Sequence, residues 1–255
     1  MTAVLDRITI FPIKSLDGVD VESARLLSSG ALEHDRQFAI VDAAGKFVNG
    51  KRTAAIHAIR AEYNLAAMTV RLGGAAEFSL REQQTEIAAW LSDALGLACL
   101  LVENTLVGFP DDVDAPGPTL LSTPTLAAVA NWFPGLTLEE TRRRFRANLV
   151  LAADAPFWED QLVGDPGDEP AFQIGDVQFH GVNPCQRCVV PTRDTITGAS
   201  IAGFQKSFAT ERERHLPAWA PRGRFNHFYR LAVNTRLAPG QSRRQLRLGE
   251  TVTLG

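Results

Sequence analysis

The chain is organised around residues 183–194, NPCQRCVVPTRD, which place two of its three cysteines beside two arginines. Residues 177–180 just before them have the composition of a strand, so this stretch is predicted to be a loop at the end of that strand. A cation beside a thiol favours the thiolate and also binds anionic ligand groups. The loop is therefore the candidate site, and the rest of the chain is interpreted as its support.

The pair formed by Cys185 and Cys188 has four interpretations. A structural zinc ion needs four ligands, and only Cys99 and five scattered histidines remain, which disfavours zinc. A thioredoxin-type redox pair needs a strand-to-helix turn, whereas residues 189–192 read as extended and then broken. Two structural thiols at the end of a strand remain open on residue type alone. So does one thiolate bound to a soft metal centre whose cofactor is gripped by arginine.

Length and composition bound the remaining possibilities. With 255 residues, 45% hydrophobic residues and a net charge of −3, the chain fits one large or two small globular domains, and its bulk charge argues against binding a nucleic-acid polymer. No apolar run approaches the ~20 residues that cross a bilayer, and the N-terminus lacks the pattern of a signal peptide. Few cysteines suit a reducing compartment. We therefore expect a cytoplasmic protein without membrane association.

Alternating and turn-bounded apolar segments dominate the chain and predict a mainly β protein with a few helices. The expected strands and hairpins cover residues 3–11, 21–27, 37–41 with 46–48, 69–72 with 77–80, 148–151, 172–174 with 177–180, and 231–235. The expected helices cover residues 86–95, which Gly96 ends, 124–132 and 201–215.

Two places could bind an anion. Lys14 and Ser15 follow the first strand, where an ammonium and a hydroxyl could hold a phosphate; a solvated turn is the alternative. Ser122 and Thr123 precede Pro124, which suits the first position of a helix that Thr123 would cap. A helix N-terminus binds anions, although a well-capped surface helix explains the same pattern.

Two further segments frame the candidate loop. The basic run 142–146 leads into the apolar strand 148–151, so alternation should turn some arginines inward, where each needs a partner. The acidic, proline-rich segment 111–118 is the most loop-like part of the chain, and we place a domain boundary and the rim of a site there.

Five motifs together resemble the MOSC family. They are PCQRC with PTRD and Thr197-Gly198, the upstream RFRANLV at 144–150, and FPIKS at 11–15. The family comprises molybdenum-cofactor proteins, including the C-terminal domain of molybdenum cofactor sulfurase and the amidoxime-reducing components. The resemblance spans nearly the whole chain and implies a MOSC-type β-barrel with an associated N-terminal β-barrel-like region. Residues 1–110 would form the N-terminal β region, whose first strands are candidates for the main barrel, and residues 111–255 the MOSC domain.

The resemblance also implies the roles of site residues. Cys188, the second cysteine of the motif, would be the molybdenum ligand and the catalytic residue, with Cys185 as a neighbour. On residue type alone Arg36 would only pair with Asp35, but the matching family arginine reaches the cofactor. The cofactor-binding set would be Lys14, Ser15, Arg36, Asp114, Ser122, Thr123, Arg146, Asn148, Gln186, Arg187 and Cys188.

The implied activity is a molybdenum-dependent reduction of N-hydroxylated compounds. Amidoximes, hydroxylamines or N-hydroxylated bases would give the amine or amidine plus water, with molybdopterin-bound molybdenum as cofactor. Because no ferredoxin-type cysteine cluster follows, electrons would come from a separate ferredoxin- or flavin-type reductase. One alternative is a sulfur carrier or cofactor-maturation protein with a persulfide on Cys188. Another is a metal-free binding module with structural thiols.

Overall fold

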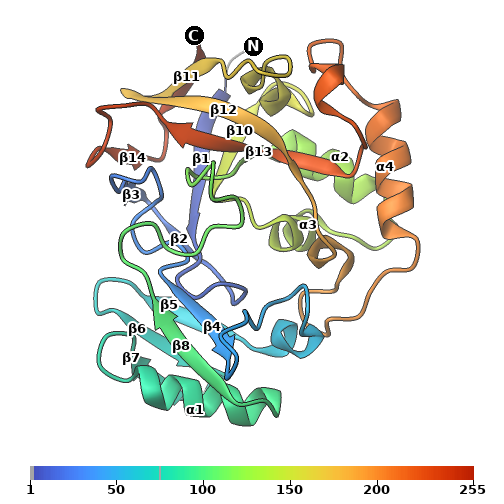
Figure 1. Ribbon diagram of the computed structural model, residues 1–255. Helices are drawn as coiled ribbons and strands as arrows, with labels where there is room; N and C mark the ends of the chain where they lie inside the picture. The colour runs from blue at the N-terminus through green and yellow to red at the C-terminus, as the bar shows by residue number, and fades with distance from the viewer. Residues whose placement is uncertain (1–2, 75) are drawn as a thin grey trace.

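The computed structural model describes residues 3–74 and 76–255, and its main feature is a β-barrel. The large sheet has the strand order β10-β9-β13-β12-β11-β15-β1-β2, and a further pairing of β10 with β1 closes seven of these strands into a barrel (Figure 1). The predicted mainly β fold is confirmed. The strands are β1 Ala3–Ile10, β2 Val19–Val21, β9 Leu120–Ser122, β10 Leu149–Ala153, β11 Ala171–Ile174, β12 Val177–Gln186, β13 Arg230–Leu237 and β15 Thr251–Leu254.

A second β region, below the barrel in Figure 1, has its own apolar core. Here β4 pairs with β8. A separate antiparallel meander consists of β5, β6 and β7, and the amphipathic helix α1 packs beside these strands. Phe38, Leu72 and Leu91 are fully buried between these elements. The bounds are β4 Phe38–Asp42, β5 Ala61–Asn64, β6 Thr69–Leu72, β7 Ala76–Ser79, α1 Gln84–Leu95 and β8 Cys99–Glu103.

Three helices cover one side of the barrel, on the right in Figure 1. They bury a third apolar cluster, in which Phe145, Phe204, Phe208 and Tyr229 make aromatic contacts. The helices are α2 Thr123–Asn131, α3 Leu138–Phe145 and α4 Phe204–Arg214. The remaining short elements are β3 Ser23–Arg25 paired with β14 Gln245–Arg247, and the 3₁₀ turns η1 Ala54–Ala58, η2 Trp158–Leu162, η3 Val190–Thr192 and η4 Arg222–Arg224.

The basic run 142–146 differs from the sequence-based expectation, because its first four residues end a helix. Thr137 caps α3 by accepting a hydrogen bond from the Glu140 amide at 3.1 Å. Glu139 then pairs with Arg142 and Arg143 at the i+3 and i+4 positions. These contacts favour a helix. The helical repeat of 3.6 residues per turn, rather than the two-residue alternation of a strand, therefore decides which arginines turn inward.

Two other local predictions need correction. Residues 37–41 also pair with β8, which the sequence did not predict, but the expected hairpin with 46–48 is present: the Val48 amide donates to the Ile40 carbonyl and the Asp42 amide to the Lys46 carbonyl, both at 2.9 Å. Residues 190–192 form the 3₁₀ turn η3 rather than an extended segment. The predicted strand 21–27 is two short strands, β2 and β3. In contrast, the 69–72/77–80 hairpin and the helix ending at Gly96 are confirmed as β6–β7 and α1.

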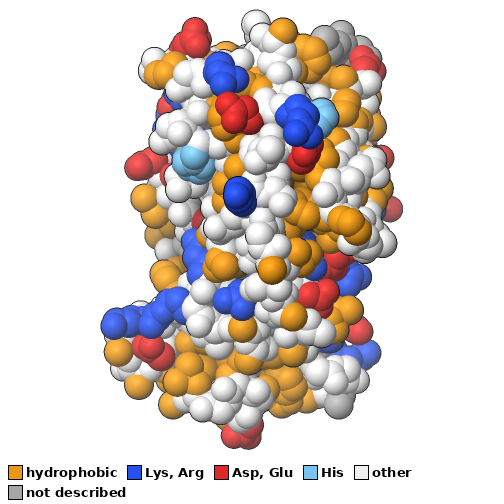
Figure 2. All heavy atoms as spheres, turned by 90° about the vertical axis from the view of Figure 1, so that its right-hand side faces the viewer, with side chains coloured by type: hydrophobic (Ala, Val, Ile, Leu, Met, Phe, Trp, Pro, Cys, Tyr) orange, Lys and Arg blue, Asp and Glu red, His pale blue; other side chains and the backbone are white. Residues whose placement is uncertain are grey.

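The two sequence halves share the barrel, because β1 pairs with β10 and β15 while β2 pairs with β1. The domain boundary between residues 110 and 111 stays a prediction. The face shown in Figure 2 carries lysine and arginine side chains beside aspartate and glutamate, and no single sign covers it. Within residues 3–74 and 76–255 no helix has the length and apolar character to cross a bilayer. The cytoplasmic location stays a prediction.

A buried ion pair ties η2 to α4. The side chains of Arg212 and Asp160 are only 1% and 5% exposed, and Nη2 lies 2.5 Å from Oδ2. The guanidinium also stacks over Phe157, with Cζ 4.1 Å from the ring centroid. Because burial removes water from both charges, loss of one partner leaves the other uncompensated.

We therefore predict that Arg212→Ala lowers the free energy of unfolding by about 3–5 kcal/mol. On the same helix, Arg214 is 65% exposed and pairs only with Glu211, so Arg214→Ala is the matched control. The control should change the free energy of unfolding by no more than about 0.5 kcal/mol. Urea unfolding of the three proteins measures both values, and equal effects of the two variants would contradict the prediction.

The adjacent Glu159 gives a pH-dependent contribution to stability. It is 1% exposed, and its Oε2 accepts a hydrogen bond from Thr125 Oγ1 at 3.0 Å. Burial, together with the charge of Asp160, raises its pKa from the ordinary 4.5 to about 7. Between these two pH values the native state keeps a proton that the unfolded chain releases, so the free energy of unfolding falls as pH rises from 4.5 towards 7.

Glu159→Gln removes this titration. The stability of the variant relative to the wild-type protein should rise from pH 4.5 to pH 7, by on the order of 3 kcal/mol, and then stay constant. Urea unfolding of both proteins at pH 5, 6, 7 and 8 checks the prediction. A difference that does not change with pH would rule it out.

Candidate functional site

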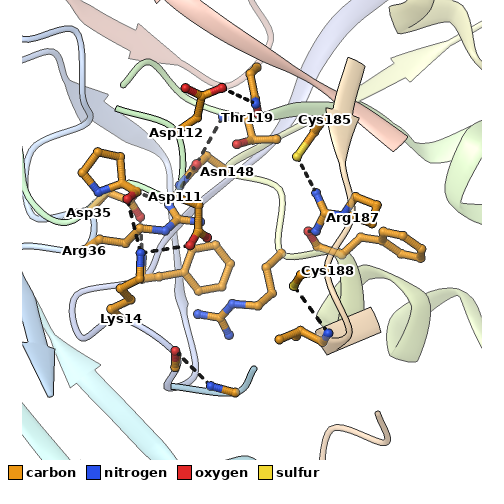
Figure 3. A pocket seen from close by; sticks show the side chains of 18 of the residues that line it. Lys14, Asp35, Arg36, Asp111, Asp112, Thr119, Asn148, Cys185, Arg187 and Cys188 are labelled. Carbon is orange, nitrogen blue, oxygen red and sulfur yellow. Dashed lines mark hydrogen bonds and ion pairs between the residues drawn. The ribbon is translucent and has the colours of Figure 1, made fainter. Parts of the chain in front are cut away.

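A cavity of about 1150 Å³ lies where the N-terminal β region meets the barrel. Its wall combines the segment after β1, the β8–β9 segment, the end of α3, the end of β12 and the start of β13 (Figure 3). Lysine and arginine outnumber aspartate and glutamate among its lining residues. Segments distant in sequence therefore build one cationic chamber.

Most of the predicted site residues line this cavity. They are Lys14, Ser15, Arg36, Arg146, Asn148, Gln186, Arg187 and Cys188. Whether they bind a cofactor stays a prediction, but the structure brings them to one place.

The other three predicted residues do not line the cavity. Ser122 is fully buried and shares a 2.8 Å hydrogen bond with Thr125, which turns its hydroxyl into the barrel interior. It, and not Thr123, occupies the N-cap position of α2, without a side-chain capping bond. The peptide oxygen of Asp114 accepts hydrogen bonds from Arg236, while its neighbours Asp111 and Asp112 line the cavity instead.

The cysteine loop is held in place by the long β12–β13 pairing. β12 carries irregularities between Gly181 and Asn183 and between Pro184 and Gln186, which bend the strand towards the cavity. A Cβ at residue 181 would lie 1.6 Å from the Leu162 carbonyl oxygen, so only glycine fits this approach. Beyond the strand, Tyr229 Oη donates to the Cys188 carbonyl at 3.1 Å, and η3 follows.

Both thiols of the loop are free, half-buried and exposed to the cavity. Arg187 Nη1 donates to Cys185 Sγ at 3.1 Å, and Nη2 donates to the Phe145 carbonyl at 2.7 Å. Cys188 Sγ accepts only a weak bond from the Val190 amide, at 3.4 Å. In Figure 3 the two sulfurs lie on one side of the cavity, opposite Lys14 and Arg36. Cys188 therefore keeps its sulfur available to a ligand.

Aspartates neutralise the cations on that opposite wall. Lys14 Nζ lies 3.0 Å from Asp111 Oδ1, and Lys51 lies 3.4 Å from the same oxygen. Arg36 pairs with Asp35 and stacks over Phe11. Burial lowers the pKa of Lys14. Burial on its own would raise the pKa of Asp111, but the positive charges of Lys14 and Arg36 outweigh it and hold that pKa below its usual range. An incoming anion would compete with Asp111 for these cations.

Arg146 is the exception on the α3 side of the cavity. Arg142 pairs with Glu139, and Arg144 with Glu140 at 2.8 Å, but the guanidinium of Arg146 makes no hydrogen bond or ion pair with any residue in the described ranges. It stacks on Phe11, with Cζ 4.2 Å from the ring centroid. Burial and the like charge of Arg36 lower its pKa to about 10. A partly buried guanidinium without a direct acidic partner is suited to an anionic ligand such as a phosphate.

Asn148 has a supporting place in this wall. Its Nδ2 donates to the Thr9 carbonyl at 3.1 Å, and its Oδ1 accepts from the Thr119 amide at 3.2 Å and from Arg36 at 3.3 Å. These bonds use both acceptor positions and one of the two N–H donors of the carboxamide, and connect β1, the residue before β9 and the Arg36 side chain. Asn148 therefore positions the wall and keeps one N–H for a ligand.

Sequence reasoning missed Asp111, Asp112 and Thr119, which line the cavity. The signal for the aspartates was present, since the 111–118 segment was expected to form the rim of a site. Asp114 itself does not line the cavity, and nothing in a loop sequence tells which side chain turns inward.

The described residues contain no group of three or more His, Cys, Asp or Glu side chains that could hold a metal ion. A metal bound through Cys188 would thus take its other ligands from a cofactor. The cavity fits such a cofactor if it carries an anionic group, because Arg146 and Arg187 have no carboxylate partner among the described residues.

Comparison with known proteins gives consistent matches. Residues 2–92 match the model of the MOSC N-terminal beta barrel domain, and residues 120–252 match that of the MOSC domain. Molybdenum cofactor sulfurase from Danio rerio is 28% identical over 238 residues, covering 73% of this chain and 28% of the relative. Molybdenum cofactor sulfurase 1 from Aedes aegypti is 27% identical over 238 residues, covering 76% and 30%.

The chain thus spans less than a third of the length of these relatives. Among solved structures, the YUAD protein from Bacillus subtilis aligns with all of this chain and 96% of its own, at a TM-score of 0.39 and 10% identity. The two domain models together cover the cysteine loop and most of the barrel and of the N-terminal β region, and on this evidence the chain belongs to the MOSC family.

Proposed function

We propose that this chain binds a molybdenum–pterin cofactor through Cys188 and reduces N-hydroxylated compounds with it. The observation that carries the proposal is a cavity in which a free cysteine faces guanidinium groups without carboxylate partners. A thiolate suits a soft metal, and arginine suits a phosphate. The relatives are molybdenum cofactor sulfurases, whose name connects them with the same cofactor, and this supports the choice of ligand.

Each part of the cavity would take one part of the ligand. Cys188 Sγ would bind the metal, Arg146 the phosphate, and Arg187, with the backbone of Gln186, the pterin side. Arg36 would stay oriented by Asn148 and Asp35. Lys14 would contact the phosphate only after giving up Asp111, so the 111–118 segment would adjust when the cofactor enters.

The proposed reaction converts an N–OH group into N–H. It consumes two electrons and two protons and releases the oxygen as water, and the bound cofactor supplies the change in metal oxidation state. The chain itself would bind and orient the substrate within the cavity, which at about 1150 Å³ is large for the cofactor alone. Electrons would come from a separate ferredoxin- or flavin-type donor.

The second candidate is a sulfur carrier or cofactor-maturation protein that bears a persulfide on Cys188. The names of the relatives, molybdenum cofactor sulfurases, favour it. The two candidates separate by experiment. Purified protein that contains molybdenum and reduces benzamidoxime with a chemical electron donor supports the reductase, whereas a persulfide on Cys188 without turnover supports the carrier.

We predict that Cys188→Ser abolishes metal binding. Loss of the only protein ligand should lower molybdenum per chain to about a tenth of the wild-type value or less, with loss of benzamidoxime reduction. Cys185→Ser, in the same loop, is the matched control and should keep at least about half of the metal, since its sulfur is not the proposed ligand. Elemental analysis of the three proteins measures this, and wild-type molybdenum content in Cys188→Ser would refute the proposal.

Arg146→Gln should weaken cofactor binding about tenfold or more, since a charge-assisted bond to the phosphate is lost. Arg143→Gln is the control, because Arg143 is half-exposed and pairs with Glu139. In cofactor-free protein Arg146→Gln should leave the free energy of unfolding unchanged or raise it, since it removes a partly buried charge that has no direct acidic partner. Retained pterin fluorescence and urea unfolding measure the two effects. An equal loss of cofactor in both variants would contradict the assignment.

A further inference from the structure

Two arginines at the outer end of the cavity are unused by the proposed cofactor site. Arg224, in η4, and Arg230, at the start of β13, both line the cavity, and neither forms an ion pair with a carboxylate in the described part of the chain. Most other lining cations, including Lys14, Arg36 and Arg144, have an acidic partner. This end of the cavity therefore carries positive charge that the protein does not neutralise.

Neutral acceptors hold both guanidiniums in place. Arg230 Nη1 donates to the Pro184 carbonyl at 2.8 Å, and Nη2 donates to Asn226 Oδ1 at 2.8 Å. Arg224 donates to the carbonyl oxygens of Val182 and Asp165. These bonds fix orientation without cancelling charge and leave further N–H groups free, because each guanidinium has five. The pair is thus preorganised for an anion.

Acidic residues near the pair form no ion pair with either arginine in the described part of the chain: Asp165 meets Arg224 through its peptide oxygen, and two others have different partners. Asp112 Oδ2 accepts from Asn183 Nδ2 at 3.3 Å and from Asn234 Nδ2 at 3.1 Å. Glu169 pairs with Arg236 at 2.5 Å. Burial and the like charge of Arg224 lower the pKa of Arg230, with the Cys185 thiol as the one acidic group acting on it. No carboxylate therefore balances this pair.

The pair lies beside the cysteine loop but apart from Arg146. In the β12–β13 register Arg230 is opposite Gln186, one position from Cys185 and two from Cys188. Arg146 follows α3 and stacks on Phe11, whereas Arg224 and Arg230 belong to η4 and β13 and are held by the Val182 and Pro184 carbonyl oxygens. Different elements thus hold the two groups of cations, and a small molecule that reaches the Cys188 sulfur would place an anionic group on Arg230 and Arg224.

We propose that Arg224 and Arg230 form a carboxylate-binding site for the substrate, so that this chain prefers N-hydroxylated compounds bearing a carboxylate. The inference rests on the proposed function for the identity of the reacting group. A guanidinium and a carboxylate match in a planar, bidentate arrangement, and a neighbouring second arginine strengthens the preference for an anion.

The test compares benzamidoxime with 4-carboxybenzamidoxime, which differ by the carboxylate alone. Binding to the purified holoprotein is measured by calorimetry without an electron donor, so that no turnover occurs. The wild-type protein should bind the carboxylate compound about tenfold more tightly or better, and added salt should reduce that preference. Arg224→Gln/Arg230→Gln should remove the preference and change benzamidoxime affinity by less than about twofold.

Arg222→Gln is the matched control, since Arg222 lies in the same turn and pairs with Glu213. It should keep the full preference. Arg224→Lys/Arg230→Lys, which retains the charges but not the planar fork, should keep part of it. Unchanged molybdenum content in each variant shows that the cysteine loop is intact.

Equal wild-type affinity for the two compounds, or no binding of the carboxylate compound, would overturn the carboxylate site. So would a preference that survives in the double glutamine variant. The proposed function fails separately: preferential binding with no reduction of either compound on adding an electron donor would retain the site and reject the reductase. Reduction of benzamidoxime without any preference for the carboxylate compound would retain the reductase and reject the carboxylate site.

Discussion

The pairing of β12 with β13 is the constraint on which the site depends. It holds the cysteine loop at one end of the barrel and sets Arg230 opposite Gln186 across the same ladder. Its irregularities bend β12 towards the cavity, and Gly181 permits the close approach to the Leu162 carbonyl. Backbone hydrogen bonds thus set where the loop begins, and the side chains of Arg187 and Tyr229 hold the rest of it through the Phe145 and Cys188 carbonyl oxygens.

Unequal neutralisation of charge gives the cavity its character. Asp111 and Asp35 balance the cations near Lys14, whereas Arg146 has only the face of Phe11 beside it. A guanidinium that is removed from water without a direct counter-ion lowers the stability of the protein. A bound anionic ligand would supply that counter-ion and restore the lost stability. The same reasoning applies at the outer end, where Arg230 is held by carbonyl and amide oxygens alone. Two separate regions of positive charge therefore remain for anionic groups.

Much of the fold was readable from sequence because its signals are local. Alternation predicted β1 and the β11–β12 hairpin, a double glycine predicted the β6–β7 turn, and helical spacing ending at Gly96 predicted α1. The failures were also local in origin. The run 142–146 was interpreted from the strand after it, whereas the Thr137 cap and the Glu139 pairs make its first part helical.

The sequence by itself determined the family, the β class and most of the residues that meet in the cavity, because motif residues are conspicuous by type and spacing. Only the tertiary structure decided that Ser122 faces the barrel interior, that Asp111 rather than Asp114 enters the cavity, and that Arg146 lacks the acidic partner its neighbours have. Those outcomes depend on where distant strands close the barrel and how loops turn at its rim, and neither is encoded in a local pattern.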